Sequence, residues 1–257
     1  MSKEILDVCL HITGSYENGS PAYDGLTGNF DKQGMSVGVL QWCAGQGSLG
    51  NLISKIIELS SAEEVDSFFS VPVSSMVGMD GNEQKQFVIA NFLPDGMKLS
   101  AIAIQQWKAL LNTEAAINAQ VELASNGVLA KATSLADKYV NNGSSNLRVV
   151  AFFFDLVTQS GGMSNSRGSV APDLEGSDLQ IESAITFAKT KSPKSSALWS
   201  SITASDPLAA LLLSYAYKRA LLSKPEYVWD ALSRRGTIAC RKGVVHGKLF
   251  DFTEALP

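Results

Sequence analysis

Apolar residues recur at intervals of three and four along most of this chain, the spacing that aligns side chains on one face of an α-helix. The pattern predicts helices over residues 4–16, 99–111 and 114–141, the last weakened near Gly127. Such helical stripes must bury their apolar faces against other elements, and the chain shows few segments with the alternation of a strand. We therefore expect a mainly α-helical fold.

Local start and stop signals define two of the later helices. Residues 147–160 are predicted as a helix that Gly161 ends, since glycine is a common residue just after a helix. Asp206 and Pro207 are a capping residue and a proline at the first turn, so a helix is predicted from there to residue 222.

The helical pattern is missing from residues 18–36, which carry glycines at positions 19, 25, 28 and 34. We predict a long loop or a small hairpin region here, and a stretch of this length inside a compact domain is usually functional. The apolar segment 37–43 that follows fits either a strand or one buried helical turn.

Charge and cysteine content exclude several classes of protein. The chain has 25 acidic and 21 basic residues, whereas proteins that bind nucleic acid or anionic membranes present a basic face. No apolar run reaches the roughly 18 residues of a membrane span, so no membrane insertion is expected. The three cysteines and two histidines match no zinc pattern. We expect buried free thiols and neither a metal nor an organic cofactor.

Two carboxylates in contrasting settings flank the glycine-rich loop. Glu17 ends the first predicted helix beside its apolar face, and Asp31 follows fourteen residues later among the glycines. Cleavage of a glycosidic bond needs one protonated carboxyl, favoured by burial, and one ionised carboxylate, favoured by a wet polar loop. Carboxylates are also abundant on protein surfaces. Spacing alone therefore leaves a catalytic and a merely solvated pair both open.

A resemblance to a known family favours the catalytic interpretation. Residues 16–50 resemble the active-site segment of the lysozyme superfamily, in which a helix, a catalytic glutamate, a glycine-rich loop or hairpin and a Gly-x-x-Gln element follow one another. Gly38-Val39-Leu40-Gln41 is similar to that element in goose-type lysozymes and lytic transglycosylases. The resemblance implies a two-lobed lysozyme-like fold with a small loop or hairpin region after the first helix.

The layout is similar in more detail to the bacterial family 46 chitosanases. Their run Asp-Gly-Arg-Gly-Tyr-Thr-Ala-Gly aligns with residues 31–38, which begin at Asp31. By this resemblance Glu17 is the general acid, Asp31 is the base that activates water, and Ser36 replaces a threonine that helps to hold the water. Such a layout implies inversion at the anomeric carbon, with carboxyl groups about 6.5–9.5 Å apart.

Two departures from the chitosanase pattern bear on the substrate. The loop between the carboxylates is shorter, and residues 39–42 (VLQW) replace an Ile-Ile-Gly-Phe run. The second departure favours peptidoglycan over chitosan. In addition, residues 154–162 and 232–251 resemble segments of phage-type and effector-type peptidoglycan hydrolases of the same group.

Several polar and aromatic residues are candidates for substrate binding. Gln41 and Asn29 are expected to hydrogen-bond N-acetyl groups. Aromatic side chains near the loop either stack on sugar faces or pack in the core. They are Tyr16, Tyr23, Phe30 and Trp42.

Later candidates lie in the C-terminal half. Asp155 and Gln159 share one face of a predicted core helix, where they either line a cleft or form a structural pair. Arg235 belongs to a basic cluster with Arg234, Arg241 and Lys242, which either binds stem-peptide carboxylates or is a solvated turn. His246 is expected to shape a subsite or to bind nothing. The cluster straddles a predicted helix over 225–235 and an irregular segment over 236–253.

The sequence therefore predicts a single lysozyme-like catalytic domain over residues 1–257. Its lobes are expected at 1–60 with 145–257, which is the catalytic lobe, and at 61–144, a helical second lobe. The expected function is hydrolysis of the β-1,4 glycan of peptidoglycan, as in a lysozyme or muramidase. The alternatives are a chitosanase, a lytic transglycosylase, and a non-catalytic wall-binding or phage structural protein with this fold.

The N-terminal residues contain no apolar segment and no cleavage site of the secretory type. We expect synthesis in the cytoplasm and action in the periplasm or cell wall after delivery by a holin or a secretion machine. The expected partners are peptidoglycan glycan strands, delivery machinery and an immunity protein, with no nucleic acid.

Overall fold

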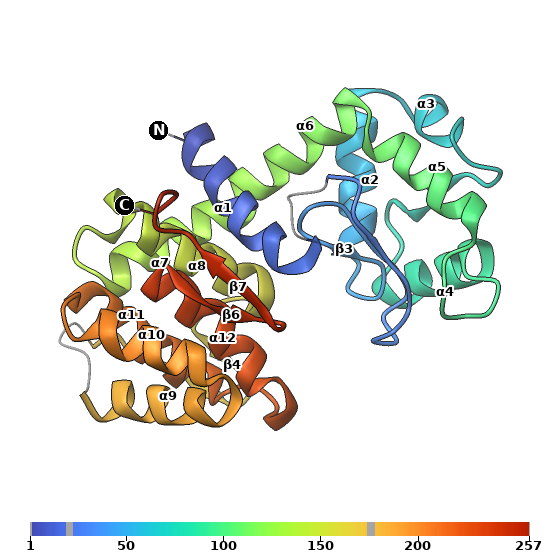
Figure 1. Cartoon of the computed structure of the whole chain (residues 1–257). Coiled ribbons are helices and arrows are strands. Elements are labelled where there is room, and N and C mark those ends of the chain that lie inside the picture. The colour runs from blue at the N-terminus through green and yellow to red at the C-terminus, as the bar shows by residue number, and fades with distance from the viewer. Residues whose placement is uncertain (1, 19–22, 174–177, 257) are drawn as a thin grey trace. The chain divides into compact units, whose positions relative to one another are not determined.

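A computed structural model describes residues 2–18, 23–173 and 178–256, and it is mainly helical (Figure 1). The chain forms two compact units. One contains Met1–Tyr16 and Gly127–Pro257, and the other contains Glu17–Asn126. The expected lobe boundaries, after residues 60 and 144, differ from this division, because helix α2 (Ser48–Leu59) packs on α6 (Glu114–Leu123) and so belongs with the central segment. That the chain is one catalytic domain stays a prediction.

The Glu17–Asn126 unit combines a small sheet with helices. The sheet has the order β1-β2-β3, and each neighbouring pair is antiparallel. Its strands are β1 (Leu26–Thr27), β2 (Ser36–Val37) and β3 (Trp42–Cys43). The helical elements that follow are α2, α3 (Ala62–Asp66), η1 (Val73–Met76), α4 (Gly81–Phe92), α5 (Ala101–Leu111) and α6. The described part of the glycine-rich region therefore supplies β1 and the first residue of β2, and 37–43 contributes strand, turn and strand rather than a helical turn.

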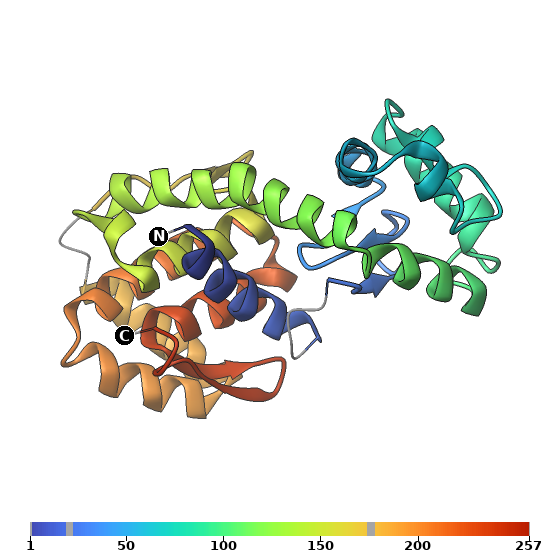
Figure 2. The ribbon, with the colours of Figure 1, turned by 90° about the horizontal axis from the view of Figure 1, so that it is seen from above.

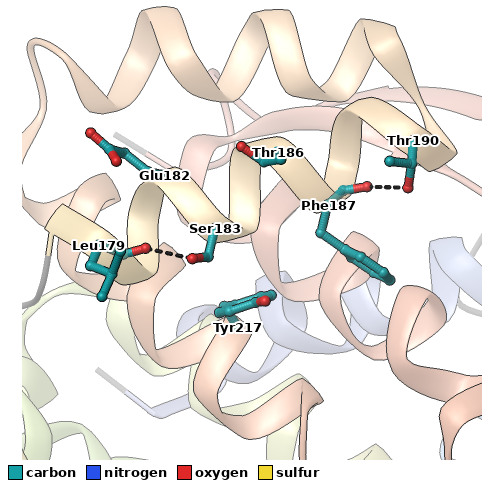
Figure 3. Close-up of a pocket in the computed structure, with 7 residues that line it drawn as sticks. All are labelled: Leu179, Glu182, Ser183, Thr186, Phe187, Thr190 and Tyr217. Atoms are coloured by element: carbon teal, nitrogen blue, oxygen red, sulfur yellow. Dashed lines mark hydrogen bonds between the residues drawn. The ribbon is translucent and has the colours of Figure 1, made fainter.

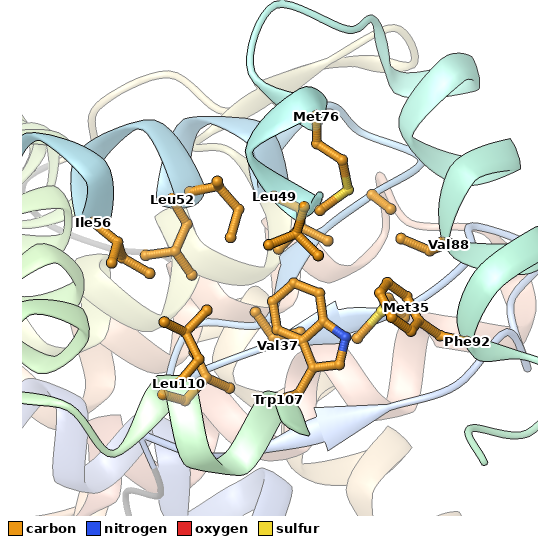
Figure 4. Close-up of a cluster of buried hydrophobic side chains, with 14 of the residues drawn as sticks. Met35, Val37, Leu49, Leu52, Ile56, Met76, Val88, Phe92, Trp107 and Leu110 are labelled. Atoms are coloured by element: carbon orange, nitrogen blue, oxygen red, sulfur yellow. The ribbon is translucent and has the colours of Figure 1, made fainter. Parts of the chain in front are cut away.

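One face of this sheet closes the hydrophobic core of the unit. Val37 of β2 is fully buried, and so is Trp107 of α5 (Figure 4). Leu49, Leu52 and Ile56 recur along the inner face of α2 at the helical spacing that the sequence shows. Because opposite residues in an antiparallel pair share a face, Leu26 and Trp42 also pack on this core.

The turn between β2 and β3 depends on a glycine. Gly38 has φ +79°, and a Cβ at this position would overlap the Oε1 of buried Gln120, which accepts a hydrogen bond from the Val39 N–H (3.0 Å). We predict that Gly38→Ala lowers the free energy of unfolding by about 2–4 kcal/mol, since the left-handed conformation alone costs an L-residue about 1–2 kcal/mol. Urea denaturation measures this change.

Gly78→Ala is the matched control for this prediction. Gly78 has φ +86° but no atom within 4 Å of its virtual Cβ, so its replacement costs only the conformational strain. Equal losses for the two variants would show that the contact with Gln120 contributes nothing.

The other unit contains the remaining helices and two-stranded hairpins. Its helical elements are α1 (Ser2–Asn18, here to Tyr16), α7 (Ala130–Tyr139), η3 (Gly143–Ser145), α8 (Leu147–Ser160), α9 (Asp178–Lys191), α10 (Pro193–Thr203), α11 (Pro207–Ala220), η4 (Pro225–Tyr227) and α12 (Val228–Cys240). The hairpins pair β4 (Ser164–Asn165) with β5 (Gly168–Ser169) and β6 (Lys242–Val245) with β7 (Lys248–Asp251). The segment 236–253, expected to be irregular, thus completes a helix and forms a hairpin.

Helix α12 lies at the centre of this unit. It packs against α8, α10, α11 and β6, and every residue from Ala231 to Cys240 is buried. Two aromatic rings of the β7 end, Phe250 and Phe252, pack edge-on against Tyr16 of α1, with centroids 5.1 and 5.8 Å away. The hairpin and α1 therefore lie side by side in this unit (Figure 2).

Local signals in the sequence are confirmed at several helix ends. The weak point at Gly127 falls in a π-helical turn, η2 (Ala124–Leu129), that separates α6 from α7. Gly161 caps α8 with φ +71°. The cysteines are free and buried, and burial raises the pKa of Cys9 to about 12, so this thiol is unreactive.

Asp206 caps α11 and also pairs with a buried arginine of α8. Its carboxylate accepts the Ala209 N–H (3.0 Å) and two hydrogen bonds from Arg148, at 2.6 and 3.2 Å. Burial opposes ionisation of Asp206, but the bonds from Arg148 and Ala209 outweigh it and lower the carboxyl pKa. The pair therefore stabilises the fold above the unfolded pKa of about 3.9, and this stability is lost as pH falls through the folded pKa.

We predict that Asp206→Asn lowers the free energy of unfolding by about 2 kcal/mol at neutral pH, because Arg148 is left buried without its counter-charge. The variant also loses less stability than the wild type between about pH 5 and pH 3. Urea denaturation at several pH values tests both points. Parallel pH profiles for the two proteins would contradict the assignment.

Candidate active site

Asp31 lies at the turn that joins β1 to β2. The turn is closed by the Lys32 N–H, which donates to the Asn29 carbonyl (3.2 Å), and Lys32 has φ +63°. One carboxylate oxygen of Asp31 accepts the Gln33 N–H (3.0 Å), while the side chain is exposed to solvent. A short, hydrogen-bonded turn therefore presents this carboxylate to water.

The buried side chain of Asn29 stabilises this turn by hydrogen bonds. Its side chain is 8 % exposed, its Oδ1 accepts the Gly34 N–H (2.8 Å), and its Nδ2 donates to the Gly96 carbonyl (2.8 Å). Both ends of the Asn29 side-chain amide are therefore used in hydrogen bonds that stabilise the turn. The predicted contact between Asn29 and an N-acetyl group stays a prediction.

Ser36 lies on the opposite face of the sheet from Val37. It is opposite Thr27 in one pair and opposite Cys43 in the other, whereas its neighbour Val37 points into the core. Gln41 lies at the adjoining turn with φ +56°, where its side chain accepts from the Thr27 hydroxyl (2.8 Å) and donates to the Gly38 carbonyl (2.9 Å). Ser36 thus belongs to the small sheet, and Asp31 and Gln41 lie in the two turns that join its strands.

Tyr23 is half-buried just before β1, and its carbonyl accepts from the Gln120 side chain (3.1 Å). Glu17 lies in the last turn of α1, directly after Tyr16. The Glu17 side chain lies outside the described residues. Its predicted role as the general acid therefore rests on the sequence.

A buried charge network surrounds the end of α1 in the other unit. Asp155 of α8 has no exposed surface and accepts two hydrogen bonds from Arg234 of α12, at 2.8 and 3.2 Å. The Arg234 guanidinium lies over the Tyr16 ring, 4.9 Å from its centroid, and the Tyr16 hydroxyl donates to the Arg234 carbonyl (3.1 Å). Arg235 Nε lies 3.9 Å from the second Asp155 oxygen.

A second series of polar contacts connects Arg235 to Tyr16 of α1. Arg235 donates to Gln159 (2.7 Å), Gln159 donates to Asp230 (2.6 Å), and Asp230 contacts Nε2 of His246 (2.6 Å). The other ring nitrogen of His246 lies 3.3 Å from the Tyr16 carbonyl. The polar residues predicted in the C-terminal half, Asp155, Gln159, Arg235 and His246, therefore belong to one network that ends at the residue before Glu17.

The two arginines are not part of a solvated turn. Arg234 is 3 % exposed and Arg235 is fully buried, and burial lowers the pKa of Arg235 to about 10 although Asp155 opposes this shift. Their charges are accommodated because α8 brings Asp155 against α12. The Arg235 guanidinium bonds to protein groups in this structure, so its predicted contact with substrate stays a prediction.

Sequence reasoning missed Asp230 as a member of this network. It is four residues before Arg234 on α12, just as Asp155 is four residues before Gln159 on α8. Residues four apart share a helix face. The available signal for Asp230 was that two predicted helices each carry a polar pair at this spacing, which favours contact between the two polar faces.

A surface pocket of about 430 Å³ lies elsewhere in the same unit, on one face of α9 facing Tyr217 of α11 (Figure 3). None of the predicted site residues lines it. In the described part of the chain, no group of three or more His, Cys, Asp or Glu side chains could hold a metal ion. No described helix is long and apolar enough to cross a bilayer.

Comparison with solved structures identifies the architecture. The chain is similar to the GH46 chitosanase of Gynuella sunshinyii in complex with chitotetraose, with a TM-score of 0.60, 11% identity, and coverage of 97% of this chain and 98% of that one. The fold is lysozyme-like. The GH46 chitosanases have this same mainly α-helical fold, so the fold predicted from the sequence is confirmed.

Further solved chains agree on the lysozyme-like fold. A native chitosanase from Bacillus subtilis MY002 aligns with a TM-score of 0.54 at 15% identity, covering 93% of this chain and 88% of that one. Another chitosanase, solved as a complex, aligns with a TM-score of 0.56 at 14% identity and covers 95% of each chain. No protein-family profile and no curated protein sequence matches the chain.

Proposed function

We propose that this chain is a glycoside hydrolase that cleaves the β-1,4 glycan backbone of peptidoglycan. The observation that carries the proposal is the position of Asp31, exposed on a hydrogen-bonded turn of the small sheet that follows α1 in a lysozyme-like fold. Glu17 precedes this sheet in the last turn of α1. The order of helix, glutamate and sheet with aspartate is the one that the family resemblance requires.

The proposed reaction assigns a role to each of three residues. Glu17 donates its proton to the glycosidic oxygen as the bond to the anomeric carbon breaks. Asp31 accepts a proton from a water molecule that attacks the opposite face of the sugar. Ser36 begins strand β2, which follows the turn that carries Asp31, and its hydroxyl helps to hold that water. Attack from the opposite face inverts the anomeric configuration.

Under this proposal the protein acts in the periplasm or cell wall. Delivery machinery and an immunity protein remain predicted partners.

A chitosanase is the second candidate, and the distribution of charge supports it. Residues 17–126 carry twelve acidic and five basic side chains, whereas the rest of the chain carries thirteen acidic and sixteen basic ones. A unit with excess negative charge attracts a polycation such as chitosan. The similar solved structures are also chitosanases, one of them a Bacillus subtilis mutant complexed with six GlcN.

Digestion of purified peptidoglycan, with products identified by mass spectrometry, tests the proposal. The expected products are muropeptides with reducing ends, and Asp31→Asn is expected to prevent their formation. Anhydro ends would instead indicate a lytic transglycosylase. Digestion of chitosan but not of peptidoglycan would select the chitosanase. Failure on both glycans would contradict a role in glycan hydrolysis.

A further inference from the structure

The turn between β6 and β7 consists of two residues, His246 and Gly247. Both have positive φ, +49° and +78°, as in a type I′ hairpin turn. Asparagine followed by glycine is the preferred pair for such a turn, because asparagine adopts positive φ at a lower cost than most residues. The hairpin therefore accepts a histidine where its backbone favours asparagine.

Both ring nitrogens of His246 face oxygen atoms. Nε2 lies 2.6 Å from a carboxylate oxygen of Asp230, and Nδ1 lies 3.3 Å from the carbonyl oxygen of Tyr16. An ionised carboxylate and a carbonyl only accept hydrogen bonds, so both contacts are hydrogen bonds only in the imidazolium, which carries a proton on each nitrogen. The neutral ring donates from one nitrogen, so it keeps one of these bonds and loses the other.

The contact with Tyr16 is made at the end of a helix. Tyr16 is among the last four residues of α1, whose carbonyls have no partner within the helix, and a cation is favoured at this end by the helix dipole. The other carboxylate oxygen of Asp230 accepts from the Gln159 amide (2.6 Å), which holds Asp230 in place. The imidazolium therefore links the last turn of α1 to α12, and the next residue of α1 is Glu17.

The ionised Asp230 is the counter-charge that His246 contacts directly. The link is complete at low pH and weakens as pH rises through about 5–8, the range in which histidine side chains lose their proton. Positive groups on the elements packed around the hairpin are paired with acidic groups or exposed to solvent. They are Arg234 and Arg235 of α12, which face Asp155, Lys242 of β6, which pairs with Asp251 (2.9 Å), and the exposed Lys194 of α10 and Lys248 of β7.

We propose that His246 is a positioning residue for Glu17, because its imidazolium fixes the last turn of α1 against α12. The inference rests on the proposed function, since it takes Glu17 as the general acid. It gives His246 a role that acts through the backbone of α1 and not through contact with the substrate.

The variant His246→Asn tests the inference, because it removes the imidazolium and places the preferred residue in the turn. Its melting temperature is expected to equal or exceed that of the wild type. With purified peptidoglycan as the substrate, kcat is expected to fall about tenfold at about pH 5.5 with KM unchanged, and the difference from the wild type is expected to shrink at about pH 8. An unchanged kcat at the lower pH would overturn the inference.

Hydrogen exchange of the backbone amides in the last turn of α1 gives a readout that needs no activity. In the wild type their protection, corrected for the intrinsic exchange rate, is expected to be about tenfold lower at about pH 8 than at about pH 5.5. In His246→Asn the protection is expected to be independent of pH. Equal pH dependence in the two proteins, or none in the wild type, would overturn the inference.

His11→Asn is the matched control, since His11 is the other histidine of the chain and is exposed on α1. It is expected to keep both the wild-type activity and the pH dependence of exchange, and loss of either would overturn the assignment to His246. Absence of glycan cleavage by the wild type would instead contradict the proposed function, and the hydrogen-exchange comparison would still decide whether His246 fixes the end of α1.

Discussion

Replacement of Glu17 by Gln is expected to reduce glycan cleavage by about 10²–10⁴-fold or more, because the amide cannot donate the proton that the departing glycosidic oxygen needs. The change is isosteric and falls in the last turn of α1. The melting temperature is therefore expected to stay within the error of measurement. Reducing-end release from peptidoglycan measures the rate, and circular dichroism measures the melting temperature.

Glu4→Gln serves as the control for this variant. Glu4 lies at the other end of α1 and is exposed, so its replacement by Gln removes the same charge from the same helix. Full activity in Glu4→Gln together with inactivity in Glu17→Gln would assign the effect to position 17. Comparable activity in both would show that Glu17 is not the acid.

Replacement of Asp155 by Asn is expected to cause the largest loss of stability, about 3–5 kcal/mol. Asp155 is fully buried and is the carboxylate that faces both Arg234 and Arg235. Removal of one partner from a buried ion pair leaves uncompensated charge in a medium that solvates it poorly. Chemical denaturation measures the change, and the end of α1 is expected to lose protection in hydrogen exchange because the Arg234 contact with Tyr16 weakens.

Asp7→Asn removes a carboxylate from the exposed face of α1 and is the control for Asp155→Asn. Its effect is expected to stay within about 0.5 kcal/mol. A loss below about 1 kcal/mol in Asp155→Asn would mean that the charge of this carboxylate contributes little to the fold.

The sequence predicted the site best where its signals are local. Asp31 was expected in a wet glycine-rich loop and lies exposed on a turn. Ser36 and Gln41 could be placed near Asp31 because they are close to it in sequence. Whether 37–43 forms strands or a helical turn could not be predicted, because the strands are fixed by pairing with other strands, which periodicity does not report. The exposure of Phe30 could not be read from the sequence, because an aromatic residue in a loop packs inward as readily as outward.

The sequence by itself determined several of the helices and where some of them end. Apolar spacing, the Asp206-Pro207 start, the Gly161 stop and the weak point at Gly127 act within a few residues, so they can be read from the chain. The tertiary structure alone decided that the Arg234 and Arg235 side chains are buried. Their partner Asp155 lies 79 residues away from Arg234 in sequence, and only the packing of α8 on α12 turns a basic pair of surface character into a buried network.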